Sequence, residues 1–193
     1  MEQDGEAYSV NITSQCRKRT NLTAMQIEHL KRIEISLPFV ADLAHAYLYL
    51  YVQTKEPGKM LVLKHYRPHT FFSEVELTGE GAFVSTLEEP LIAAAFAKGK
   101  FIQGQREWRF GINLEMYVQP IKCGNDVIGV VSLETGHSYA NSSNYHQLMD
   151  TALYLLDYAK KPLDKDEFHP MSPGTGIIIA DSNNRIVFAN LSA

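Results

Sequence analysis

The chain has 193 residues, of which 45% are hydrophobic and 21% are charged, and this composition is typical of a globular protein with one well-filled core. Its formal net charge of −4 at pH 7 argues against direct, general nucleic-acid binding. The sequence lacks both a signal peptide and a run of roughly 20 apolar residues that would span a membrane. The two cysteines, Cys16 and Cys123, form neither a metal motif nor a disulfide framework, so we expect a reducing cytoplasm and no membrane association.

The N-terminal part of the chain predicts a leader followed by a helix. Residues 1–19 are polar, and we expect an irregular, disordered leader there. Between residues 22 and 45 apolar residues recur at helical spacing, and Thr23 with Gln26 forms a weak capping box. Pro38 removes one backbone donor and is expected to kink this helix, which should end near His45.

Two strands are predicted next. Residues 47–52 alternate tyrosine with an aliphatic residue, and a period of two is typical of a β-strand. A turn at residues 56–59 leads to a second strand at 60–65, which closes a hairpin. The mixed residues 66–86 predict a loop with room for one short strand or helical turn.

The second half of this region predicts a helix, further strands and a closing helix. Residues 86–98 form the first helix, with Thr86 as its cap and Gly99 just past its end. The other elements are a strand at 101–109, a hairpin of strands 115–122 and 127–133, and a helix at 144–160. This order predicts an α+β fold, in which a central antiparallel sheet carries the N- and C-terminal helices on one face.

The last residues predict the beginning of a second domain. Residues 161–175, rich in proline and charge, form a linker, and residues 176–193 contain two short strands around an Asp-Ser-Asn-Asn turn. The matched positions Ile177, Asp181 and Arg185 give this tail a resemblance to the opening of a PAS sensor domain. We therefore expect the chain to be a piece of a longer, modular protein.

Short motifs in a fixed order point to a family. They are Leu22–Leu30, the Leu-Pro-Phe-Val-Ala-Asp-Leu-Ala segment at 37–44, Arg-Pro-His-Thr at 67–70, Glu-Pro-Leu to Gly at 89–99, Val-Gln-Pro-Ile at 118–121 and Val-Ile-Gly-Val at 127–130. Together they resemble the GAF-like N-terminal domain of a family of soluble bacterial sensor histidine kinases. The resemblance implies a GAF-like sensor domain at residues 20–160.

The resemblance also implies what lies outside this chain. The parent would continue into a kinase core that uses ATP and Mg²⁺, and this chain by itself would have no cofactor and no enzymatic activity. The expected partners are a second copy in a homodimer and a response regulator, which in this family often binds RNA. A small-molecule ligand is a further expectation, although the resemblance does not name one.

Aromatic residues on the central strands and middle loops predict where such a ligand would bind. Alternation places Tyr47, Tyr49 and Tyr51 on one face of their strand. Apolar pockets with a few polar groups are how small ligands are held, and arginines such as Arg106 suit an anionic ligand. The candidate pocket residues are Tyr49, His65, Arg67, Phe71, Trp108, Arg109 and Tyr117.

Other interpretations of these residues stay open. The aromatic residues also fit plain core packing with solvated arginines, and the two long helices also fit a dimerisation module without a ligand. A small GAF-fold enzyme would use Cys123. No catalytic or metal site is predicted, because His65 and His69 flank a proline and the sequence has neither a Gly-x-Ser-x-Gly nor a phosphate-binding motif.

Overall fold

The computed structural model describes residues 11–69, 78–109, 111–136, 145–158, 178–180 and 183–189. In chain order the elements are α1 (Ile12–Arg19), α2 (Ala24–Glu34), α3 (Leu37–Ala44), β1 (Tyr47–Gln53), β2 (Lys59–Tyr66), β3 (Phe83–Ser85), α4 (Pro90–Lys98), β4 (Ile102–Arg109), β5 (Ile112–Cys123), β6 (Asp126–Gly136), α6 (Tyr145–Tyr158), β7 (Ile178–Ala180) and β8 (Ile186–Ala189). No helix within these ranges is both long and apolar enough to cross a membrane.

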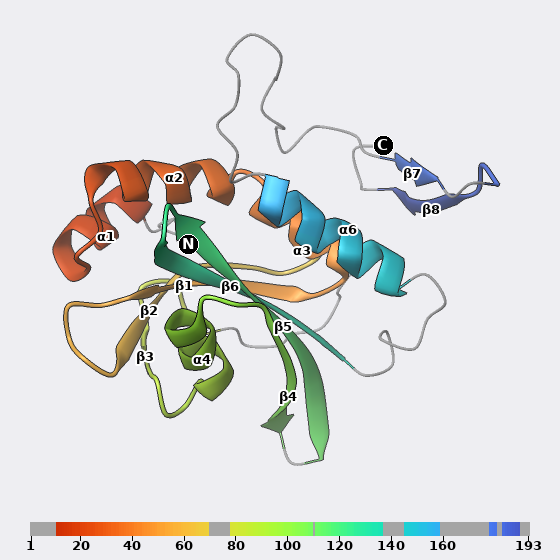
Figure 1. The fold of residues 1–193 in the computed structure, drawn as a ribbon. Helices are drawn as coiled ribbons and strands as arrows, with labels where there is room; N and C mark the ends of the chain where they lie inside the picture. The colour runs from red at the N-terminus through yellow and green to blue at the C-terminus, as the bar shows by residue number, and fades with distance from the viewer. Residues whose placement is uncertain are drawn as a thin grey trace, which may run out of the picture.

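Six strands form one curled antiparallel sheet in the order β3-β2-β1-β6-β5-β4 (Figure 1). The β1–β2 and β5–β6 hairpins meet at its centre, where β1 pairs with β6 and Leu48 lies opposite Leu133. This mixed architecture confirms the predicted α+β, GAF-like fold and the two hairpins in it.

The two faces of the sheet are covered differently. Helices α1, α2, α3 and α6 lie over one face, and α4 lies over the other (Figure 1). Because side chains alternate along a strand, Leu48 and Leu50 of β1 join the core under the four helices, whereas Tyr49 and Tyr51 join the core under α4. The predicted separation of tyrosines from aliphatic residues along this strand is confirmed.

The predicted long helix is two helices. The capping box is present, since the Thr23 hydroxyl accepts from the Gln26 backbone N–H and the Gln26 side chain accepts from the Thr23 backbone N–H. Helix α2 then ends at Glu34, and Pro38 lies in the first turn of α3, where a missing N–H breaks no helical hydrogen bond. The proline therefore starts a new helix instead of kinking one. Helix α3 ends at Ala44 with His45 as its C-cap, close to the predicted end.

The irregular leader predicted at residues 1–19 is wrong over its second half. Residues 12–19 form helix α1, capped by Asn11, whose side-chain oxygen accepts from the Ser14 backbone N–H at 3.0 Å. Ile12 and Cys16, one turn apart, are both buried in the core between the sheet and helices α1, α2, α3 and α6, which we call the helix-side core. Two apolar residues are too few for sequence periodicity to reveal such a helix, which packing stabilises.

Helix α4 begins later than predicted. It starts at Pro90, because proline has a fixed φ suited to a first helical position. Thr86 belongs to the preceding turn, in which a Glu88 carboxylate oxygen accepts from the Ser85 backbone N–H at 2.8 Å. Gly99 ends the helix with a left-handed φ of 58°, as its position predicted.

The C-terminal hairpin is present as predicted. Strands β7 and β8 pair antiparallel, with Ile179 opposite Phe188, and form a separate two-stranded sheet. The linker predicted at 161–175 lies outside the described residues. The resemblance of this hairpin to the start of a PAS domain stays a prediction.

Candidate functional site

A carboxylate lies in the core under α4. Glu134 stands near the end of β6, opposite Tyr47 of β1 and Met116 of β5, and its side chain has no exposed surface. The register places it on the tyrosine-bearing face of the sheet. A buried charge is costly unless other groups pair with it and satisfy its hydrogen bonds, so its neighbours define the site.

Arg106 of β4 pairs with this carboxylate and with a second one. One of its terminal nitrogens, Nη2, lies 2.6 Å from Glu134 Oε2, and the other, Nη1, contacts Glu89 at the start of α4. The Ser132 hydroxyl donates to the remaining Glu134 oxygen at 3.0 Å. We call Arg106, Glu89 and Glu134 the Arg106 cluster; it joins β4, α4 and β6 through one guanidinium.

The charges of the Arg106 cluster do not balance. Two carboxylates face one guanidinium, which leaves one negative charge in excess when all three groups are ionised. Burial raises the pKa of Glu134 to about 7, with Arg106 opposing the rise and Glu89 adding to it. Burial also raises the pKa of Glu89. Burial lowers the pKa of Arg106, but the two carboxylates more than offset this and hold it above its ordinary value.

Two tyrosines lie beside the cluster. The rings of Tyr49 and Tyr51 are 6.0 Å apart and almost wholly buried. Burial, followed by the charge of Glu134, raises the pKa of both phenols, so both stay neutral. The His65 ring lies 6.3 Å from that of Tyr49, and its Nδ1 is buried without a hydrogen-bond partner among the described residues. The cluster is therefore bordered by buried aromatic rings.

The predicted pocket residues do not all meet at one place. Tyr49 and His65 lie next to each other beside the Arg106 cluster, whereas Arg67 is exposed. Tyr117 lies on the opposite face of the sheet, where its ring packs 6.2 Å from that of Tyr145.

The structure leaves three of the predicted pocket residues without a described side chain. Phe71 lies outside the described residues, and Trp108 and Arg109 stand at the end of β4 with side chains outside the described part. The role of all seven residues as ligand contacts stays a prediction.

Sequence reasoning missed the two carboxylates of the cluster. The sequence predicts Arg106 as a polar group of the pocket, but it predicts neither Glu89 nor Glu134 there. A signal for Glu134 was present, since it follows the nearly continuous apolar run of β6, where a charge is unusual. Glu89 gave no comparable signal, because an acid at the start of a helix is common.

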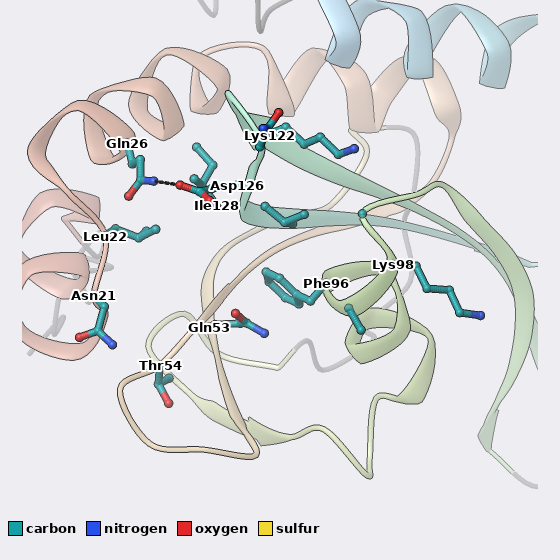
Figure 2. A pocket seen from close by; sticks show the side chains of 14 residues that line it. Asn21, Leu22, Gln26, Gln53, Thr54, Phe96, Lys98, Lys122, Asp126 and Ile128 are labelled. Carbon is teal, nitrogen blue, oxygen red and sulfur yellow. Dashed lines mark hydrogen bonds between the residues drawn. The ribbon is translucent and has the colours of Figure 1, made fainter.

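A separate groove of about 540 Å³ opens beyond the last pair between β1 and β6, Tyr51 with Val130. Its lining is Asn21, Leu22, Gln26, Gln53, Thr54, Phe96, Ala97, Lys98, Gly99, Lys122, Asn125, Asp126, Val127 and Ile128. The Gln26 side chain of α2 donates to Asp126, the first residue of β6, at 3.3 Å, and the Lys98 side chain extends away from the other lining residues (Figure 2). This lining does not include any of the seven predicted pocket residues.

The described residues offer little for metal or thiol chemistry. They contain no group of three or more His, Cys, Asp or Glu side chains placed to hold a metal ion. Cys16 is buried, and burial raises the pKa of its thiol to about 11, which makes the thiolate rare at neutral pH. Cys123 is a free, partly buried residue at the end of β5 and packs against the helix-side core.

A curled antiparallel sheet with the terminal helices on one face and α4 on the other is the architecture of a GAF-like domain. A family model described as the GAF domain of histidine kinase PdtaS matches residues 12–152, which is most of the chain. The chain therefore belongs to this family. No curated protein matches the sequence at a significant level.

Solved structures share the fold at low sequence identity. The sensor region of a sensor histidine kinase matches with a TM-score of 0.65 and 20% identity over 94% of this chain and 66% of that one, so this chain spans just under two thirds of its length. The second GAF domain of DevS from Mycobacterium smegmatis matches with a TM-score of 0.51 and 13% identity, over 68% of this chain and 90% of that domain.

Proposed function

We propose that this chain is the cytoplasmic regulatory region of a two-component histidine kinase and controls autophosphorylation of a kinase core that follows it. Membership of the PdtaS GAF family over residues 12–152 supports this assignment. The proposed parent uses ATP and Mg²⁺ only in its kinase core, forms a homodimer and passes phosphate to a response regulator.

The Arg106 cluster is the observation that carries a regulatory role. Replacing buried ion pairs by apolar residues of similar volume is often neutral or stabilising, so a cluster with unbalanced charge is a poor device for stability alone. It joins three elements through one side chain, and any event that alters its charge changes how α4, β4 and β6 hold together. In this proposal the domain has two arrangements of α4, β4 and β6, and a signal changes their relative populations.

Helix α6 provides the output in this proposal. It packs along α3 and against the sheet through Tyr145, and it precedes the linker and the PAS-like hairpin. A shift in the sheet would move α6 and be passed to whatever follows. The homodimer in the proposal uses the outer sides of the helix layer, where Met25 and Tyr154 are 69% and 64% exposed.

The test is autophosphorylation of the parent protein with labelled ATP. We expect the parent to incorporate phosphate, the 193-residue chain alone to incorporate none, and removal of residues 11–158 to change the parent's rate severalfold. A rate that does not respond to this removal would contradict the proposed function.

A further inference from the structure

We infer that the Arg106 cluster is a proton-binding regulatory site, in which Glu134 takes up one proton and thereby alters the end of β6, which is hydrogen-bonded to the end of α3, the helix that packs on α6. This inference rests on the proposed function and names the ligand of the same site. The ligand is the proton itself.

The geometry of the cluster favours a proton over a larger cation. The titratable and charged groups around Glu134 are Arg106 from β4, Glu89 from α4, Tyr47, Tyr49 and Tyr51 from β1, and, on the far side of Tyr49, His65 from β2. Arg106 is the one permanent cation among these described groups, so the two carboxylates paired with it carry one negative charge more than it balances. The Glu134 side chain has no exposed surface, and a proton is the smallest cation that can neutralise it there.

The energetics of the group agree with this geometry. Burial raises the pKa of Glu134 to about 7, and Glu89 adds to the rise against the opposing effect of Arg106. Burial also raises the pKa of the nearby phenols of Tyr49 and Tyr51, so these side chains stay protonated while Glu134 titrates. The change in charge therefore falls on the carboxylates of the cluster.

Protonation must rearrange the hydrogen bonds of Glu134. In the ionised form each oxygen accepts one hydrogen bond, from Arg106 at 2.6 Å and from Ser132 at 3.0 Å. A neutral carboxyl carries a donor on one oxygen and loses the charge that strengthens the bond to the guanidinium. Arg106 then interacts more strongly with the ionised Glu89 than with the neutral Glu134. Its guanidinium is therefore held more by the start of α4 and less by β6.

The neighbouring residue connects this change to the helices on the other face. Thr135 follows Glu134, is fully buried and donates from its hydroxyl to the backbone oxygen of His45 at 3.1 Å. His45 ends α3 with a left-handed φ of 44°. On the same face Tyr145, the first residue of α6, packs on Tyr117 of β5. The end of β6 thus contacts Arg106 on one face of the sheet and the end of α3 on the other.

The direct test is a ¹³C NMR titration of the glutamate carboxyl carbons of the 193-residue chain between pH 5 and 9. We expect one carboxyl signal with a midpoint near 7, absent from Glu134→Gln and retained in Glu28→Gln, which alters an exposed glutamate on α2. A midpoint below about 5, or no transition of Glu134 in this range, would overturn the inference. Glu89→Gln removes a neighbouring negative charge and should lower the midpoint, which provides a second variant if Glu134→Gln does not fold.

A second measurement tests the regulatory half of the inference. Hydrogen exchange of the amides of residues 145–158, corrected for the intrinsic pH dependence, should differ at least threefold between pH 6 and pH 8 in the wild type and Glu28→Gln. The difference should vanish in Glu134→Gln. Titration of Glu134 without any change in α6 would overturn the coupling. If removal of residues 11–158 alters the parent kinase but Glu134 does not titrate, the proton inference fails while the proposed function stands.

Discussion

At the scale of the residue, Glu134 makes the stability of the fold depend on pH. Its pKa lies near 7 in the folded chain and near the ordinary 4.5 in the unfolded chain. The folded state therefore binds more protons than the unfolded state between these values, and stability falls as pH rises from about 4.5 to about 7. The pKa difference between the two states corresponds to a change in unfolding free energy of roughly 3 kcal/mol across this window.

Replacing Glu134 by glutamine should remove this dependence. Glutamine has the shape of the protonated acid and no titration, so the difference in unfolding free energy between Glu134→Gln and the wild type should grow with pH over that window. Urea unfolding at a series of pH values measures it, with Glu28→Gln as the exposed control. Parallel curves for wild type and Glu134→Gln would show that the group does not titrate in the fold.

At the scale of the element, the β1–β6 junction depends on a glycine. A Cβ at Gly129 of β6 would lie 3.2 Å from the backbone oxygen of Tyr51 and 3.1 Å from Leu30 Cδ2. The backbone contact is the harder of the two to relieve, because Tyr51 is held in β1 at the centre of the sheet. Gly129 thus lets α2 and β1 both approach β6 closely.

We expect Gly129→Ala to lower the free energy of unfolding by about 1–2 kcal/mol, the range typical of modest overpacking. Gly79→Ala is the matched control, because a Cβ there meets nothing within 4 Å among the described atoms. Chemical denaturation of both variants measures the difference. Equal stabilities would mean that the junction has more room than this geometry implies.

At the scale of the whole molecule, local signals in the sequence predict the elements but not the cluster. The alternation of β1 and the Thr23–Gln26 capping box each lie within a few residues, and both are confirmed. The pairing of Arg106 with Glu134 depends on the strand order β6-β5-β4 and on the position of α4. A short stretch of sequence specifies neither of these. The sequence predicts Tyr117 in the same pocket as Tyr49, but Tyr117 lies on the opposite face of the sheet. Alternation within one strand shows which side chains share a face, but not which face of the neighbouring strand they join.

The fold connects the Arg106 cluster on one face of the sheet to the helices on the other face through β6. Glu134 and Thr135 are consecutive, so their side chains leave β6 on opposite faces, one toward Arg106 and one toward the end of α3. Thr135→Val keeps the shape of the side chain but removes the hydroxyl that donates to His45. The loss of this part-buried hydrogen bond should cost about 1 kcal/mol.

If this hydroxyl carries the coupling, Thr135→Val should leave the titration midpoint of Glu134 unchanged and reduce the pH response of α6. Thr54→Val is the control, since it removes exposed hydrogen bonds of a threonine hydroxyl in the β1–β2 turn, one of them to the Glu56 backbone oxygen at 2.9 Å. The NMR titration and the hydrogen exchange of residues 145–158 report the two properties separately. An undiminished response in Thr135→Val would exclude this hydrogen bond as the connection and point instead to packing contacts such as that of Tyr145 on Tyr117 of β5.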